Sequence, residues 1–291
     1  MVATRDWFGF SYPVSLCTQC GLLRAGECFT PESMGRFYQN WYRNVYQSPM
    51  DGGVAEEWTV RAAQTEQRFA QINSVVKLER GSTVVDVGCN FGSLLAPFQA
   101  AGMDVWGCDL GGEHLEYGRS RLGLTQLVTG DAQTLISKDV QADLIILDHV
   151  FEHFADPLEE LRHIVDLLKP GGRVFVSVPG TWWWTKNVCG SDFLALLQNA
   201  HCFQYDLETL TETFARLGFE PEYGDEHVTA VFRHTGNIPT IGPAPERAVQ
   251  VLRRLQAMGR LWKTKHFAGR VLRAVGLHGI VSRALAQPIE R

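Results

Sequence analysis

The stretch VVDVGCNFGSLL, residues 84–95, decides the fold of this chain. Its first residues, rich in valine, predict a strand, and Gly88 and Gly92 predict a tight turn that leads into a helix. In such a strand–turn–helix unit, a ligand can approach backbone amides at the helix N-terminus, beside the carboxyl end of the strand. The sequence therefore predicts a binding site at this point of the fold.

Downstream of this unit, short apolar runs alternate with amphipathic stretches. The expected strands are residues 83–87, 104–108, 126–129, 143–147 and 173–178. The expected helices between them are residues 92–101, 112–122, 132–138 and 157–168. Strands that are apolar on both faces and separated by helices indicate a parallel sheet with helices on both sides. The expected fold class is therefore α/β, of the doubly wound kind.

Both ends of the α/β region carry further elements. An apolar stripe on a polar stretch predicts a helix over residues 56–78, and another helix is expected over residues 206–217. Only a short turn-prone segment, residues 223–226, separates the last two expected strands, which favours an antiparallel hairpin. We therefore expect a seven-stranded, mostly parallel sheet with a terminal antiparallel hairpin, a small irregular N-terminal segment and a helical C-terminal tail.

Composition limits the possible functions. The 291 residues are 45% hydrophobic and 20% charged, as in ordinary globular proteins, and the net charge of −5 argues against a general nucleic-acid binder. Residues 246–291 hold ten Lys or Arg against two acids, whereas the rest of the chain is acidic. Seven cysteines, and no charged-then-apolar stretch at the N-terminus, favour a reducing cytoplasm. No apolar run approaches the roughly 18 residues of a membrane span.

Further polar motifs stand at the ends of the expected strands. Asp109 closes the second strand, where an acid can bind both ribose hydroxyls of a nucleoside. The ordered set of motifs resembles that of class I S-adenosylmethionine-dependent methyltransferases, and it covers residues 60–235. This set is 86-DVGCNFG-92, Asp109, Gly130-Asp131-Ala132, 148-DHVFEH-153 and 168-LKPGG-172. The resemblance implies a Rossmann-like fold that binds S-adenosylmethionine, whereas the Gly-x-Gly-x-x-Gly spacing of nicotinamide-dependent dehydrogenases is not met.

The resemblance also implies a role for each motif residue. The turn residues would border the methionine part of the ligand, Asp109 the ribose, and Asp131 with Ala132 the adenine ring. Asp86 would reach the ligand amino group, directly or through water. The remaining expected cofactor residues are Gly88, Cys89, Asn90, Gly92, Leu110 and Asp148. Asn90 stands where the family usually has glycine, and asparagine tolerates the positive φ of such a turn.

Residues 148–157 supply the candidate catalytic groups. The Glu-His and Asp-Pro pairs in this segment resemble the subgroup that acts on small molecules, quinones and sugars. His153 is the expected general base if the acceptor requires one, and Glu152 is expected to orient it or to line the pocket. The alternative for His153 is to cap or pack beside the following helix. His201 is the second candidate base, whereas His149 and His163 are expected to pack or to lie on the surface.

Three tryptophans, residues 182–184, directly follow the fifth expected strand. Three adjacent large rings cannot all face one core, so at least one is expected to line the acceptor site or a partner surface. A packed lid without ligand contact is the alternative, because aromatic clusters are more often packing than recognition.

Cys17 and Cys20 have the Cys-x-x-Cys-Gly spacing of a zinc knuckle. A closed zinc site needs four ligands, and the sequence has no second pair of this kind. Cys28 is a candidate third ligand, and no fourth is evident. The preferred interpretation is a vestigial knuckle that packs as an apolar element, with zinc as the alternative. Sugar methyltransferases that resemble this chain often carry two such pairs.

The expected organisation is an aromatic N-terminal segment (residues 1–57), a methyltransferase domain (58–235), and a linker with a basic amphipathic helix (236–291). That helix can lie on an anionic membrane surface, dock on an acidic partner, or fold back on the acidic body. The expected function is methyl transfer in the cytoplasm to a hydroxyl oxygen of a small-molecule or glycan-type acceptor, and a sugar or surface-polysaccharide precursor is favoured. The alternatives are O- or C-methylation of a quinone or natural product, and a non-catalytic S-adenosylmethionine-binding partner protein.

Overall fold

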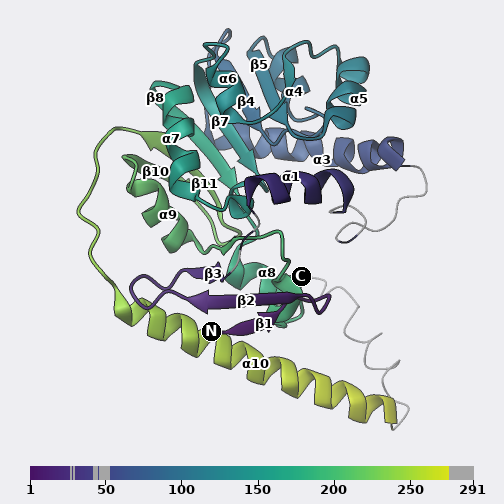
Figure 1. The fold of residues 1–291 in the computed structure, drawn as a ribbon, viewed down its shortest axis with the longest axis vertical. Coiled ribbons are helices and arrows are strands. Elements are labelled where there is room, and N and C mark those ends of the chain that lie inside the picture. Colours follow the sequence, from purple (N-terminus) through teal and green to yellow (C-terminus); the bar gives the residue numbers. More distant parts are fainter. Residues whose placement is uncertain (27, 29, 42–44, 46–52, 275–291) are drawn as a thin grey trace, which may run out of the picture.

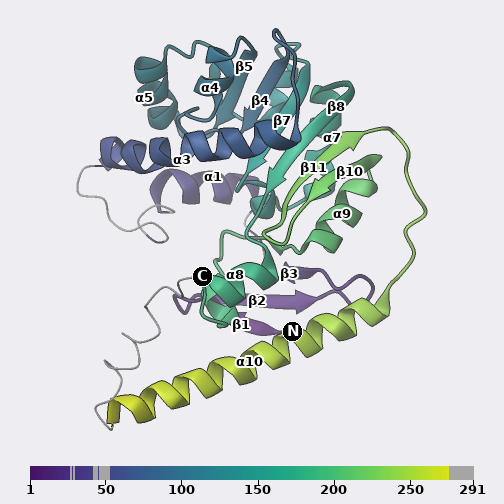
Figure 2. The same ribbon diagram turned by 180° about the vertical axis from the view of Figure 1, so that it is seen from behind.

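The computed structural model describes residues 1–26, 28, 30–41, 45 and 53–274. Figures 1 and 2 show an α/β body above a small sheet, with the long helix α10 (Pro245–Ala274) along the lower edge. No described helix combines the length and the apolar character that crossing a membrane would require.

The α/β body is built on a seven-stranded sheet with the order β10-β11-β8-β7-β4-β5-β6. Strands β4 to β8 pair in parallel, and β11 pairs antiparallel with both β8 and β10. This arrangement confirms the expected, mostly parallel sheet with a terminal hairpin. The strands are β4 (Thr83–Val87), β5 (Asp104–Asp109), β6 (Leu127–Thr129), β7 (Ala142–Asp148), β8 (Leu168–Ser177), β10 (Phe219–Gly224) and β11 (Thr229–His234).

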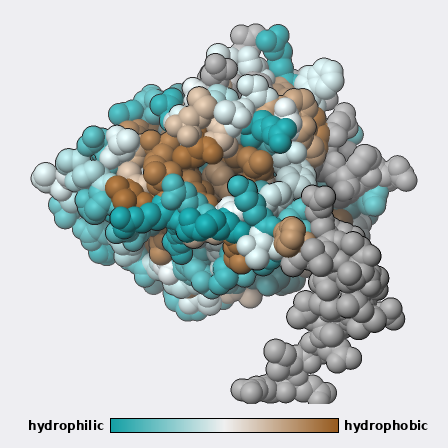
Figure 3. Space-filling view, turned by 90° about the horizontal axis from the view of Figure 1, so that it is seen from below, coloured by the Kyte–Doolittle hydropathy of each residue, from teal (hydrophilic) through white to brown (hydrophobic). Residues whose placement is uncertain are grey.

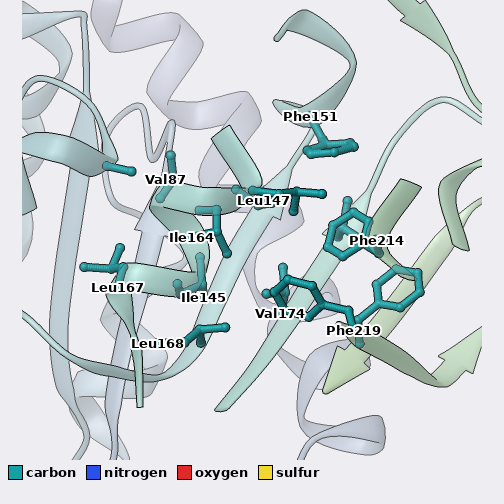
Figure 4. Close-up of a cluster of buried hydrophobic side chains, with 14 of the residues drawn as sticks. Val87, Ile145, Leu147, Phe151, Ile164, Leu167, Leu168, Val174, Phe214 and Phe219 are labelled. Atoms are coloured by element: carbon teal, nitrogen blue, oxygen red, sulfur yellow. The ribbon is translucent and has the colours of Figure 1, made fainter. Parts of the chain in front are cut away.

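Helices cover both faces of this sheet, because successive side chains of a buried strand point to opposite sides. Ile145 of β7 belongs to a buried cluster that includes residues of α6, α7 and α9, whereas Ile146 belongs to one that includes residues of α3, α4 and α5. Figure 4 shows the first of these clusters, with Ile145 and Leu147 near Ile164 and Leu167 of α7. The helices are α3 (Gly53–Val75), α4 (Leu95–Ala100), α5 (Gly112–Leu122), α6 (Ala132–Ile136), α7 (Pro157–Leu167) and α9 (Leu207–Ala215).

Local signals in the sequence begin these helices. The carboxylates of Asp131, Asp156 and Asp206 accept a hydrogen bond from the third backbone amide of α6, α7 and α9. Pro157 also occupies the first turn of α7, where its missing N–H is not needed. Strand β8 begins at Leu168, earlier than the expected residue 173, because Leu168 already pairs with Ala142 of β7.

The N-terminal segment differs from the expected irregular structure. It forms three strands of a four-stranded antiparallel sheet with the order β1-β2-β3-β9. These strands have two to six residues, too few for a clear periodicity, and β9 lies far along the chain. They are β1 (Ala3–Arg5), β2 (Ser11–Leu16), β3 (Leu23–Ala25) and β9 (Phe203–Gln204), and helix α1 (Pro31–Asn40) follows β3.

One face of α10 packs on this small sheet. Val251 and Leu255 join a cluster with Tyr12 and Val14 of β2. The guanidinium of Arg247 lies 3.1 Å from Glu208 and 2.7 Å from Glu212, both on α9. The basic tail therefore folds back on the acidic body over this part of its length.

Candidate active site

A cavity of about 1240 Å³ lies at the carboxyl ends of the parallel strands. Residues of α3 and Met34 of α1 also contribute to its walls. The structure brings together nine of the ten residues that the sequence assigns to the cofactor. They are Asp86, Gly88, Cys89, Asn90, Asp109, Leu110, Asp131, Ala132 and Asp148.

The turn after β4 requires left-handed backbone at three positions: φ is 75° at Gly88, 52° at Asn90 and 71° at Gly92. A Cβ at Gly88 would lie 2.5 Å from the Val150 side chain, so a larger residue cannot fit there without movement. Gly92 is the one expected cofactor residue outside the cavity lining. A Cβ at Gly92 would lie 2.9 Å from Leu127, so glycine serves the packing of the turn at that position.

Asp109 joins two loops at the end of β5. Its Oδ1 accepts a hydrogen bond from the Gly111 amide at 2.7 Å, and its Oδ2 accepts one from the Asn90 amide at 2.9 Å. These two bonds hold the carboxylate in one orientation at the cavity wall. The ribose-binding role of Asp109 stays a prediction.

Carboxylates dominate this part of the cavity. Asp86 is 4% exposed, and its burial, together with the charges of Asp148 and Asp109, raises its pKa well above the usual value. Such a wall suits a ligand with positive groups, as the ammonium and sulfonium of S-adenosylmethionine are. These carboxylates therefore fit S-adenosylmethionine as the cofactor. The Arg68 guanidinium of α3 lies 3.0 Å from Asp148 Oδ1, a contact that nothing in the local sequence predicts.

A second group of titratable residues lies in the same cavity, around the buried carboxylate of Glu152. Its Oε1 is 3.7 Å from His149 Nδ1, 3.8 Å from His153 Nε2 and 4.0 Å from His201 Nε2. The structure thus brings together the three residues that the sequence assigns to catalysis. It also places His149 there, against the expectation that His149 only packs or lies on the surface.

Burial and charge set the protonation of this cluster. Burial lowers the pKa of His153, and burial with the nearby His153 lowers the pKa of His201 to about 3. Burial alone would raise the pKa of Glu152, but His153 and the other imidazoles lower it to about 2. Burial lowers the pKa of His149 less than Glu152 and Asp148 raise it, so its net shift is upward. His149 is therefore the member of the cluster that holds a proton most readily beside an anionic Glu152, whereas His153 and His201 favour the neutral form.

Backbone contacts orient the two buried histidines. His153 Nδ1 lies 3.0 Å from the Ala200 carbonyl, which accepts the Nδ1 proton and makes Nε2 the proton-accepting nitrogen. Tyr12 of β2 donates its hydroxyl proton to the His201 carbonyl and accepts from Gln204 Nε2 at 3.2 Å. The small N-terminal sheet therefore supports the segment that carries His201.

Two sets of residues offer metal ligands. The ligand atoms of Glu152, His153 and His201 lie within 4.8 Å of one another, the one such group of three among the described residues. Cys17 and Cys20 lie between β2 and β3 within hydrogen-bonding distance of each other. The Cys28 thiol forms a hydrogen bond with the Cys202 thiol, and among the described residues it makes no group of three with Cys17 and Cys20. Zinc at the cysteine pair stays a prediction.

The three tryptophans of α8 (Thr181–Asn187) lie in different environments. Trp184 lines the cavity, with its ring 6.1 Å from that of His149. Trp183 lies 4.1 Å from the ring of His227, and Trp182 donates to Asp206 at 2.9 Å. Only Trp184 among them is placed to touch a ligand in the cavity.

With the fold and the cavity described, comparison with known proteins decides the family. A family model for the methyltransferase domain matches residues 58–223, more than half of the chain. The chain belongs to this methyltransferase family. Its fold and motif order are those of the class I S-adenosylmethionine-dependent enzymes.

Individual relatives share less of the chain. A ubiquinone biosynthesis O-methyltransferase from Vibrio cholerae serotype O1 is 37% identical over 106 residues, or 33% of this chain and 42% of that protein. The protein of the same name from Pectobacterium carotovorum is 31% identical over 125 residues, or 39% and 51%. The matched region thus spans about half the length of these relatives.

Solved structures are similar at lower identity. The magnesium protoporphyrin IX methyltransferase from Synechocystis PCC 6803 has a TM-score of 0.48 and 18% identity, covering 70% of this chain and 98% of that one. A methyltransferase from Thermotoga maritima has a TM-score of 0.48 and 14% identity, covering 69% and 99%.

Proposed function

We propose that this methyltransferase transfers the methyl group of S-adenosylmethionine to a hydroxyl of an aromatic small molecule of the quinone-precursor type. The names of the relatives at 31–37% identity support a quinone-type acceptor over the sugar or polysaccharide precursor favoured by the sequence alone. The argument for a sugar acceptor depends on the Cys17–Cys20 pair. Among the described residues, no third metal ligand lies close to this pair.

The observation that carries the proposal is the position of the Glu152–His153–His201 cluster. Its residues line the same cavity as the motif residues at the ends of β4, β5 and β7. S-adenosylmethionine supplies an already activated methyl group, so the protein must mainly position the acceptor and remove its proton. A proton acceptor beside the cofactor residues meets that requirement.

In this proposal His153 Nε2 takes the proton of the acceptor hydroxyl. The lowered pKa of His153 keeps the imidazole neutral near pH 7, so the base is ready before the acceptor binds. Glu152, 3.8 Å away, stabilises the imidazolium that forms. The ring of His201 packs edge-to-face on that of His153, with the ring centroids 4.7 Å apart.

The remaining wall suits an aromatic acceptor. Trp184 and His149 form an edge-to-face pair at the cavity, beside Pro179 and Phe154. Aromatic rings prefer such offset and edge-to-face contacts to a face-to-face sandwich, so a further ring can pack against this pair. We place the acceptor ring against Trp184, with its hydroxyl toward His153.

The test is turnover with methyl-labelled S-adenosylmethionine and a panel of acceptors: dihydroxybenzoates, polyprenylated dihydroxybenzenes and nucleotide sugars. We expect the labelled methyl group to become bonded to a hydroxyl oxygen of a dihydroxybenzene ring. Transfer to nucleotide sugars alone would replace the quinone-type acceptor with the sugar. Binding of S-adenosylhomocysteine without transfer to any class would favour the non-catalytic alternative.

We also propose that the outer face of α10 contacts an anionic membrane surface. Its exposed side alternates apolar residues with basic ones, namely Val249, Leu252 and Phe267 with Arg253, Arg260 and Lys263. Figure 3 shows the molecule from this side, with hydrophilic and hydrophobic areas next to each other. Such a helix binds lipid through buried apolar area and attraction to anionic headgroups. Sedimentation with phosphatidylglycerol vesicles, and not with phosphatidylcholine vesicles, is the expected result.

A further inference from the structure

Helix α3 directs one buried carboxylate, that of Glu57, onto the cofactor turn. Glu57 is 5% exposed, although the helix around it is largely exposed. Its Oε1 accepts a hydrogen bond from Asn90 Nδ2 at 3.2 Å, and its Oε2 lies 3.1 Å from His114 Nε2. Asn90 belongs to the turn after β4, and His114 to the first turn of α5. Glu57 therefore ties α3 to both loops.

Glu57 and Asp109 connect the same two loops in different ways. Asp109 binds the backbone amides of Asn90 and Gly111, whereas Glu57 binds the side chains of Asn90 and His114. Each carboxylate thus spans the turn after β4 and the beginning of α5. Asp109 holds the loops from within the sheet, and Glu57 holds them from the helix that lies over the cavity.

Apolar contacts reinforce this junction. The ring of Trp58 lies 5.6 Å from that of Phe91 in the cofactor turn and 5.9 Å from that of Tyr117 in α5. Phe91 is fully buried and also packs on His114 at 4.8 Å. The first turns of α3 are therefore held to the cofactor loops by both polar and apolar contacts.

The orientation of α3 matters because its following turns form a wall of the cavity. Arg61, Gln64, Arg68 and Gln71 all line it, at the spacing of one helix face. A helix held at Glu57 keeps this face over the space assigned to the methyl donor.

We propose that Glu57 is a positioning residue for the methyl donor, which acts by fixing Asn90 and α3 over the cofactor pocket. This role explains why residue 90 is asparagine, where class I methyltransferases usually have glycine. Asparagine still adopts the required φ of 52°, and its side chain supplies the amide that Glu57 binds. Glycine would meet the backbone requirement but would leave Glu57 with one fewer donor.

The test is calorimetric titration of the full chain with S-adenosylhomocysteine, in wild type and in Glu57→Leu. Loss of hydrogen bonds to a buried charged group is expected to weaken binding about tenfold or more. Glu57→Gln should restore most of the affinity, because its carbonyl can accept from Asn90 and its amide can donate to His114. The matched control is Glu66→Leu, an exposed position of α3 outside the cavity lining, which should bind as wild type does.

A double-mutant cycle with Asn90→Gly separates positioning from a general loss of stability. In the Asn90→Gly background, Glu57→Leu should cost at least threefold less affinity than in wild type. At saturating donor, kcat of Glu57→Leu should stay within about twofold of wild type, while KM for the donor rises.

The proposal is overturned by wild-type affinity in Glu57→Leu, by equal losses in both backgrounds, or by a Glu57→Gln variant as weak as Glu57→Leu. If Glu57→Leu does not fold, the milder variants Glu57→Gln and Asn90→Gly still test the proposal. Glu57→Gln must then bind S-adenosylhomocysteine more tightly than Asn90→Gly does. The calorimetric titrations need no acceptor, so these affinity outcomes are independent of the proposed quinone-type substrate; only the kcat and KM comparison requires turnover.

Discussion

The half of the cavity assigned to the cofactor and the half assigned to the acceptor are assembled differently. The cofactor half takes Asp86, Asp109 and Asp131 from the ends of neighbouring parallel strands. The acceptor half joins Glu152 and His153, after β7, to His201, almost fifty residues later along the chain, with support from Tyr12 near the N-terminus. The first half is local to one sheet, and the second depends on two sheets.

This difference separates binding from chemistry. Carboxylates and backbone amides define the cofactor half, whereas buried imidazoles around one carboxylate define the acceptor half. A change in one half should therefore leave the property of the other half intact. The following predictions test that separation, beginning with the largest expected effect.

Replacement of His153 by glutamine should abolish most turnover without loss of donor binding. Removal of a positioned general base typically costs about 10²- to 10⁴-fold in rate. The measurement is kcat together with the affinity for S-adenosylhomocysteine, with His163→Gln, on α7 and outside the cavity lining, as the control. A comparable loss of affinity in His153→Gln would show that the two halves are not separable.

Stability should fall in acid because of His201. Its pKa is lowered from 6.5 to about 3, so below pH 6.5 the unfolded chain binds a proton that the folded chain does not. The free energy of unfolding should therefore decrease by about 1.4 kcal/mol per pH unit from this group as the pH falls toward 3. Urea unfolding at several pH values measures the slope, which should be shallower in His201→Gln. Identical slopes in the two proteins would remove His201 from this effect.

Tyr12→Phe should lower turnover, although Tyr12 lies outside the cavity lining. The phenol donates to the His201 carbonyl and accepts from Gln204, so its loss should cost about 1 kcal/mol of stability. We expect a several-fold lower kcat and an unchanged affinity for S-adenosylhomocysteine. A kcat equal to that of wild type would mean that the small sheet does not position His201.

Chelation is expected to have the smallest effect. If His153 acts as a base, removing divalent ions with EDTA should leave turnover unchanged, because no ion is then required at Glu152, His153 and His201. Loss of turnover that is restored by one added divalent metal would instead make this group of three a metal site.

The sequence predicted the α/β body, and it named nine residues that the structure brings to one cavity, because both depend on local patterns. Apolar runs marked the strands, and Asp86, Asp109 and Asp131 follow strand ends, which a parallel sheet brings to one edge. Gly92 was the exception, since only the fold shows that it packs against Leu127 rather than facing the cavity.

The sequence could not predict contacts between distant segments. The four-stranded sheet pairs β3 with β9, strands of three and two residues that carry no periodic signal. Glu57 gave no sign in the sequence of its bonds to Asn90 and His114, which lie 33 and 57 residues further along the chain. All of these contacts arise from packing of elements far apart in the chain.

The central claim is that the cavity binds S-adenosylmethionine through its carboxylate half. The most direct measurement is calorimetric titration with S-adenosylhomocysteine, comparing wild type with Asp109→Ala. We predict saturable one-to-one binding to wild type and at least about a hundredfold weaker binding to Asp109→Ala, which loses charged hydrogen bonds to the Asn90 and Gly111 amides. Equal binding to both proteins, or none to folded wild type, would contradict the claim.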